Sequence, residues 1–127
     1  AALGVKNTSQ WSKDLDNKAN KKFVQDFQKE YGRLPSLYAS QGYDTGKLLI
    51  SALNVADVKD QDKFRSALKN ANFESTRGSF KFDTNQHPIQ DIYVREVIKE
   101  GKILTNKIIS TGLKNRSNAY VKDCPLK

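Results

Sequence analysis

The sequence predicts a chain of the α/β class, and a change of hydrophobic spacing along the chain carries that prediction. In the first half, apolar side chains recur at intervals of three and four residues, which is the spacing of one helix face. After Gly78 they alternate, as they do in strands with one covered face. A β-prone segment, Leu3 to Thr8, opens the chain and is expected to be a buried strand. The expected order is one strand, three helices and an antiparallel set of strands.

The first helix is expected after a polar loop, where Asp16 or Asn17 can accept the N-cap hydrogen bond. Its apolar face consists of Phe23, Val24, Phe27 and Tyr31. Gly32 suits the left-handed position that ends a helix, and Pro35 prevents continuation.

The second helix is expected to begin near Ser36 and to extend to about Val55. Its apolar stripe consists of Ala39, Tyr43, Leu49, Ile50, Ala52 and Leu53. Gly46 lies in the middle, where glycine costs roughly 1 kcal/mol relative to alanine, so another element is expected to pack closely there. A shorter helix is expected after Asp60.

The second half predicts a series of antiparallel strands. Phe80 and Phe82 are expected on one face of a strand, and residues 83–88 have the composition of a turn. A longer strand over residues 92–98 is expected to turn at 100–102 and return through residues 104–109. Residues 115–127 are polar and read as a surface tail with one short turn. The chain therefore divides near Thr76, and its two halves could cover each other as an α+β domain.

Composition narrows the class of function. There are 22 lysine and arginine residues against 14 aspartate and glutamate residues, which gives a formal charge of +8. The lysines alternate with acidic residues instead of forming a run, so they indicate a solvated surface more than a nucleic-acid arm. The chain shows neither a membrane-spanning apolar run nor a signal peptide. Its one cysteine, Cys124, cannot form an internal disulfide.

Catalytic and metal-binding patterns are not recognised. His87 is the one histidine and stands in a predicted turn, without a second zinc ligand or a nucleophile at suitable spacing. Asp14 and Asp16 lack the glycine and distal glutamate of a calcium loop. We therefore expect a protein that is not an enzyme and that needs no cofactor.

Three stretches carry a resemblance to a known family: 7–11 (NTSQW), 35–44 (PSLYASQGYD) and 77–83 (RGSFKFD). Together they resemble the C-terminal part of bacterial ABC-transporter solute-binding proteins of the branched-chain amino-acid (Leu/Ile/Val-binding) type. The resemblance covers essentially the whole chain, whereas the family is several-fold longer. It implies part of the type I periplasmic-binding fold, in which two Rossmann-like lobes close on a ligand.

On that template, residues 1–76 are expected to be a late portion of the N-terminal lobe, and residues 77–127 to cross the hinge into the C-terminal lobe. The resemblance implies that Tyr38 and Gln41 line the ligand cleft. It also allows Trp11 at the cleft rim, although packing against the following helix is the favoured role of this residue. Thr76, Arg77 and Gly78 are implied to form the hinge.

The implied partners are a small carboxylate ligand, an ABC permease in the membrane and a missing N-terminal remainder of the same protein. The ligand class stays open between branched-chain amino acids and aromatic or other hydrophobic acids. The implied location is the periplasm, with an export signal outside this chain. The alternative is a self-standing basic α+β module that binds nucleic acid or another polyanion, with an affinity that falls steeply with salt.

Overall fold

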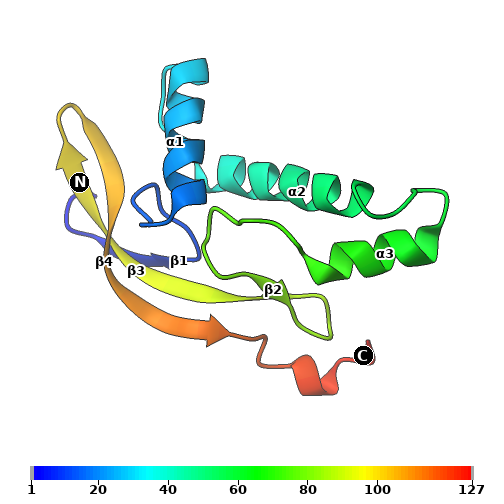
Figure 1. Cartoon of the computed structure of the whole chain (residues 1–127). Helices are drawn as coiled ribbons and strands as arrows, with labels where there is room; N and C mark the ends of the chain where they lie inside the picture. The colour runs from blue at the N-terminus through cyan, green and yellow to red at the C-terminus, as the bar shows by residue number, and fades with distance from the viewer. Residues whose placement is uncertain (1, 127) are drawn as a thin grey trace.

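The computed structural model describes residues 2–126. Figure 1 shows two helices lying side by side, a third helix at an angle to them, and a long curved hairpin of strands. The elements are β1 (Lys6–Ser9), α1 (Lys18–Tyr31), α2 (Leu37–Leu53), α3 (Gln61–Asn70), β2 (Lys81–Phe82), β3 (Pro88–Glu100), β4 (Ile103–Arg116) and the short 3₁₀ helix η1 (Val121–Asp123). The mixed α/β class expected from the sequence is confirmed.

Helix ends follow the predicted capping residues. Asn17 caps α1 by accepting from the backbone N–H of Asn20 at 2.8 Å, and Gly32 ends that helix with φ +64°. Ser36 and Asp60 cap α2 and α3 in the same way. Side-chain oxygens thus satisfy amide groups that the first turn of a helix leaves free.

The sheet is built around β3, which pairs with each of the other strands in the described residues. Strand β4 pairs with it along one side, from Gln90–Arg116 to Glu100–Ile103. On the other side, β1 pairs with residues 93–96 and β2 with residues 88–89, all antiparallel. The start of the chain is therefore hydrogen-bonded to a strand that lies beyond the predicted boundary at residue 76. The division into two lobes at that point stays a prediction.

Two predicted strands differ from those observed. Leu3 and Val5 are 63% and 52% exposed, and the first strand begins only at Lys6. It runs along the surface beside β3, so its leading residues have no layer above them. The strand expected around Phe80 and Phe82 is short, since only residues 81–82 pair with β3. The Phe80 and Phe82 rings nevertheless contact each other, with centroids 5.1 Å apart.

The core lies where the first turns of α1 meet the sheet. Trp11, Leu15 and Phe23 are buried together. Tyr43 of α2 and Tyr93 of β3 pack against them from two sides. These contacts join the loop before α1 to both a helix and a strand.

The apolar stripe expected on α2 is only partly covered. Ala52 is fully buried, whereas Ile50 and Leu53 are 56% and 53% exposed. A Cβ added at Gly42 or Gly46 would meet no atom within 4 Å, so nothing in residues 2–126 packs closely there. The expected close neighbour of Gly46 is thus not found in the described part of the chain.

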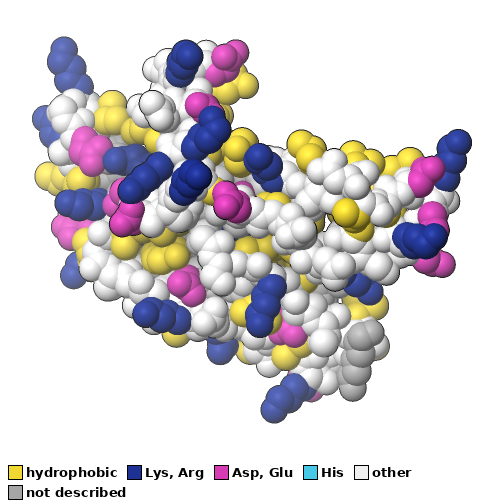
Figure 2. Space-filling view, in the orientation of Figure 1, with side chains coloured by type: hydrophobic (Ala, Val, Ile, Leu, Met, Phe, Trp, Pro, Cys, Tyr) yellow, Lys and Arg dark blue, Asp and Glu magenta, His cyan; other side chains and the backbone are white. Residues whose placement is uncertain are grey.

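Charged side chains are intermixed on the face shown in Figure 2, where lysines and arginines alternate with acidic groups. Several charged side chains of the described residues form ion pairs, such as Lys22 with Asp26 at 2.7 Å and Lys13 with Glu100 at 2.8 Å. This agrees with the solvated surface expected from the sequence.

Candidate functional site

Tyr38 and Gln41 lie in the first two turns of α2, the place predicted to contact a ligand. The N-cap is formed by Ser36, whose Oγ accepts from the N–H of Ala39 at 3.3 Å. Tyr38 is 79% exposed and Gln41 is partly buried. Residues three apart are neighbours on a helix surface, so the phenol and the amide share one face. A ring with a hydroxyl beside a primary amide can stack on an apolar group and hydrogen-bond a carboxylate.

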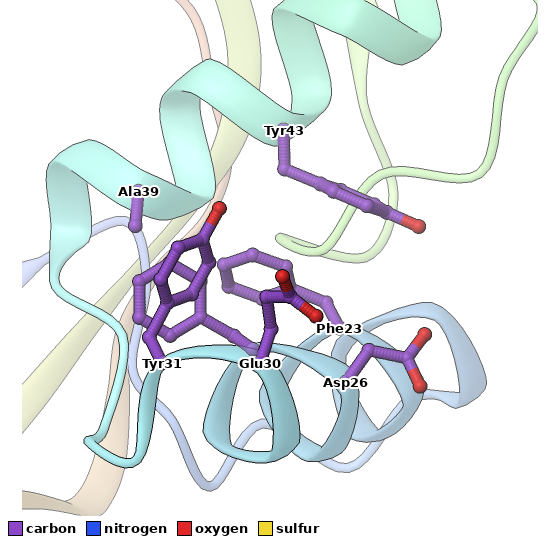
Figure 3. A pocket seen from close by; sticks show the side chains of 7 residues that line it. Phe23, Asp26, Glu30, Tyr31, Ala39 and Tyr43 are labelled. Carbon is purple, nitrogen blue, oxygen red and sulfur yellow. The ribbon is translucent and has the colours of Figure 1, made fainter.

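A hollow of about 440 Å³ lies on another face of the same helix, between α1 and α2 (Figure 3). Ala39 and Tyr43 face it from α2. Its other lining residues belong to α1 and are Phe23, Asp26, Phe27, Glu30 and Tyr31. Asp26 is paired with Lys22, and Lys47 lies over the Tyr43 ring, 5.7 Å from its centroid. Tyr38 and Gln41 do not line this hollow.

Trp11 is placed in the core and not at an open rim. Its side chain is 3% exposed and makes an edge-to-face contact with Phe23, with centroids 6.3 Å apart. The burial supports the packing role that the sequence favours. A direct ligand contact by Trp11 is untested, and nothing in its surroundings supports it.

The predicted hinge residues are held against α2. The carboxylate of Asp44, which is 2% exposed, accepts from the backbone N–H of Thr76 at 2.9 Å and from Nε of Arg77 at 3.1 Å. Ser75 Oγ donates to the same carboxylate at 2.6 Å. Ser40 and Thr76 add a buried hydroxyl pair 2.8 Å apart.

Arg77 also contacts the segment that follows the predicted hinge. Its Nη1 donates to Oε1 of Gln90 on β3 at 2.9 Å, and its guanidinium lies 4.5 Å from the Phe80 ring centroid. Gly78 has φ +88°, a backbone conformation suited to glycine. Arg77 therefore joins α2 to β3 directly in front of a conformationally permissive residue.

A second arginine ties the Trp11 loop to the sheet. Arg95 of β3 donates to Oδ1 of Asn7 through Nε at 2.9 Å and Nη2 at 2.6 Å, and to the carbonyl of Trp11 through Nη1 at 2.8 Å. Burial lowers the pKa of the Arg95 guanidinium, and the nearby charge of Asp14 opposes that shift. Burial likewise raises the pKa of the Tyr93 phenol, helped by Asp91.

The structure thus places Tyr38 and Gln41 on α2 and holds Thr76 and Arg77 against the same helix, whereas Trp11 lies in the core. The sequence placed Asn20 in the polar group that caps the first helix and did not predict its hydrogen bond to Trp11, nor the contacts of Arg95. Asn20 could have been noticed, because it is a polar residue on the same helical face as Phe23 and Phe27, and such residues usually satisfy buried partners. Arg95 gave no such signal, because its partners are far away in sequence.

The remaining candidates are surface features. His87 is exposed, and its Nδ1 lies 3.0 Å from Nδ2 of Asn118. Within residues 2–126, no three His, Cys, Asp or Glu side chains are grouped so that they could hold a metal ion. No helix in that range has the length and apolar character needed to cross a membrane.

The described chain is thus part of an α/β fold, in which the N-terminal part of one helix is hydrogen-bonded to the segment that leads into the sheet. Comparison with known proteins gives the family. A model of the periplasmic binding protein family matches residues 1–102, and the chain belongs to that family. It has part of the type I fold, of the branched-chain amino-acid type.

The chain is also similar to individual solute-binding proteins. The chain is 34% identical over 104 residues to a Leu/Ile/Val-binding protein homologue of Brucella abortus, covering 77% of this chain and 26% of that protein. A solute-binding protein of R. palustris in complex with benzoate is 30% identical, with a TM-score of 0.84 over 93% of this chain and 32% of that one. A substrate-binding protein of Desulfitobacterium hafniense in complex with Leu is 26% identical, with a TM-score of 0.72, covering 85% and 32%. The chain thus spans about a quarter to a third of the length of these proteins.

Proposed function

We propose that this chain is part of the solute-binding component of an ABC importer and contributes Tyr38 and Gln41 to the ligand cleft. The observation that carries the proposal is the N-terminal end of α2, where a largely exposed tyrosine in the first turn is followed by an amide one turn later. Free amide groups and the helix dipole favour an anion at such a position. A carboxylate ligand fits both groups.

The proposed ligand is a small apolar or aromatic carboxylate. Support comes from two related structures, one in complex with benzoate and the other with Leu. Both compounds carry a carboxylate next to an apolar group, which suits the tyrosine ring and the helix N-terminus. The choice between an aromatic acid and a branched-chain amino acid depends on groups that this chain does not contribute.

The mechanism would be capture by closure of two lobes. A ligand that touches both lobes stabilises the closed state in proportion to its differential affinity for that state. The chain would bend within the segment formed by Thr76, Arg77 and Gly78, where the portions 1–76 and 77–127 meet, and an N-terminal remainder outside this chain would complete the cleft. The exposed face of α2 supports the need for such a remainder, because contact of the apolar side chains of Ile50 and Leu53 with water is unfavourable.

The loaded protein would deliver its ligand to a membrane permease from the periplasm. The family match supports this partner and this location. The rival function, a basic module for nucleic acid, gains no support from the intermixed surface charges or from the relatives.

The test is ligand titration of the whole protein that carries this chain, after its intact mass has been measured under denaturing conditions. Calorimetry with benzoate and with L-leucine should show binding of one of them. Tyr38→Ala should weaken that binding by about tenfold or more, the usual effect of losing a buried aromatic contact. The matched control is Tyr120→Ala, since Tyr120 is also highly exposed, at 74%.

Unchanged affinity in Tyr38→Ala would remove this residue from the cleft. Failure of the wild-type protein to bind either acid, together with salt-sensitive binding to DNA, would favour the polyanion module.

A further inference from the structure

We propose that Asp44 is a positioning residue for ligand capture: it fixes the crossover at residues 75–77 to helix α2, so that both move as one body and the chain bends beyond them. The inference rests on the proposed function, because it names how one side of that cleft is held. It assigns to Asp44 a task that its place in the middle of a helix does not suggest.

Hydrogen-bond donors from the crossover occupy both carboxylate oxygens of Asp44. Oδ1 of Asp44 accepts from the main-chain N–H of Thr76, and Oδ2 accepts from Oγ of Ser75 and Nε of Arg77. Because one donor belongs to the main chain, the contact fixes the path of the backbone and not only a side chain. Thr76 is fully buried, and its hydroxyl is paired with Ser40 one helical turn before Asp44. The crossover is thus held at two successive turns of α2.

Charge balance explains why a carboxylate can occupy this buried place. Arg77 is paired with it, and the Arg77 side chain is itself only 11% exposed. A buried carboxylate is tolerated when a cation and further donors satisfy it, whereas removal of one partner leaves the other uncompensated. The pair is therefore a fixed joint and differs from the exposed ion pairs on the surface.

The bending point follows from the order of the contacts. Every partner of Asp44 precedes Gly78, whereas the other two partners of the Arg77 side chain, Phe80 and Gln90, follow it. A rotation at Gly78 would move Phe80 and Gln90 past the guanidinium and leave the Asp44 contacts intact, and β1 would move with β3, to which it is hydrogen-bonded. Gly78 has the positive φ that permits such changes, and an added Cβ would come no closer than 3.9 Å to another group.

The Asp44 joint also lies close to the two residues proposed to contact the ligand. Tyr38 and Gln41 lie six and three residues before Asp44 on the same continuous helix. At a rise of 1.5 Å per residue they stand within about 9 Å of it along the helix axis. A rigid helix transmits the position of the crossover to both side chains, so loosening the joint should misplace them relative to the opposite lobe.

The experiment compares Asp44→Asn with Ala52→Gly in the whole protein. Ala52 is also fully buried on α2, so its glycine variant loses stability on the same helix without touching the crossover. Circular dichroism first identifies conditions under which each variant is folded. Calorimetry with benzoate and with L-leucine is then run under those conditions. Asp44→Asn should weaken binding by about tenfold, the effect of losing a charged buried hydrogen bond. Ala52→Gly should leave the affinity unchanged, and Ser75→Ala, which keeps the ion pair, should fall between them.

Amide hydrogen exchange provides a readout that does not depend on a ligand. The Thr76 amide should exchange faster in Asp44→Asn than in the wild type, whereas amides of α3 should not change. The inference would be overturned if the Thr76 amide exchanged in Asp44→Asn at the same rate as in the wild type. It would also be overturned if Asp44→Asn and Ala52→Gly lost affinity equally. If the wild-type protein binds neither acid, the proposed ligand class fails, and exchange at Thr76 still decides whether Asp44 forms the joint.

Discussion

The indole Nε1 of Trp11 donates a 2.7 Å hydrogen bond to Oδ1 of Asn20, and both side chains are buried. The other end of the same amide is also occupied, because Nδ2 of Asn20 lies 3.2 Å from the carbonyl oxygens of Ser12, Lys13 and Leu15. One side chain thus closes the loop before α1 onto the first turn of that helix.

Replacing Asn20 by alanine should destabilise the protein by about 2–4 kcal/mol, because the indole N–H and at least two buried carbonyls lose their partner. The change is measured as a shift of the urea unfolding midpoint of the whole protein. Asn70→Ala, at the exposed end of α3, is the matched control and should stay within about 0.5 kcal/mol. Equal midpoints for the two variants would contradict the role of Asn20.

Arg95→Lys should lower the melting temperature, although it keeps the charge. The guanidinium reaches the Asn7 side chain and the Trp11 carbonyl at once through a planar fork, and a single ammonium cannot reproduce that geometry. We expect a loss of about 1–2 kcal/mol by thermal unfolding. Arg116→Lys, at the exposed end of β4, provides the comparison. A similar loss of stability in that variant would show that the planar geometry of the Arg95 guanidinium is not the cause.

We expect the stability of the protein to depend on pH in the alkaline range because of Tyr93. Burial raises the pKa of its phenol above that of an exposed tyrosine. The unfolded chain therefore releases this proton first, so the stability that depends on the neutral phenol is complete below about pH 10 and is lost as the pH rises through the folded pKa. Melting temperatures measured between about pH 8 and about pH 11 should fall less steeply in Tyr93→Phe than in the wild type. Parallel curves would show that another group is responsible, and Tyr120→Phe controls for the loss of a hydroxyl.

Gly46→Ala tests whether something covers α2 in the whole protein. On an open helix face this change should stabilise by about 0.5–1 kcal/mol, because alanine is the better helix former. The neighbouring space is empty within residues 2–126. If the remainder of the protein packs closely at this glycine, as we expect, the added methyl group lowers the melting temperature instead. A rise in the melting temperature would show that the face stays open.

The sequence predicted the helices and their ends well because those signals are local. Asn17, Ser36 and Gly32 act within one turn of the positions that they define, so short-range patterns suffice. The alternation after Gly78 likewise predicted the β3–β4 hairpin with its turn at Gly101.

The parts that the sequence did not predict depend on distant contacts. The pairing of residues 6–9 with residues 93–96 joins segments almost ninety positions apart, and no local pattern encodes that partner. Burial of Trp11 follows from the same pairing, because the strand carries it beneath Tyr93 and Phe23. The hinge and ligand roles of Tyr38, Gln41, Thr76, Arg77 and Gly78 came from family resemblance and stay predictions.

The uncovered face of α2 also bears on how the chain survives in the cell. Leu49, Ile50 and Leu53 form the kind of water-exposed apolar ridge that chaperones bind and that promotes aggregation. Until another segment covers it, we expect this ridge to make the polypeptide prone to aggregation and proteolysis. Expressed without a covering partner, the chain should accumulate poorly, degraded by proteases before it can serve any purpose.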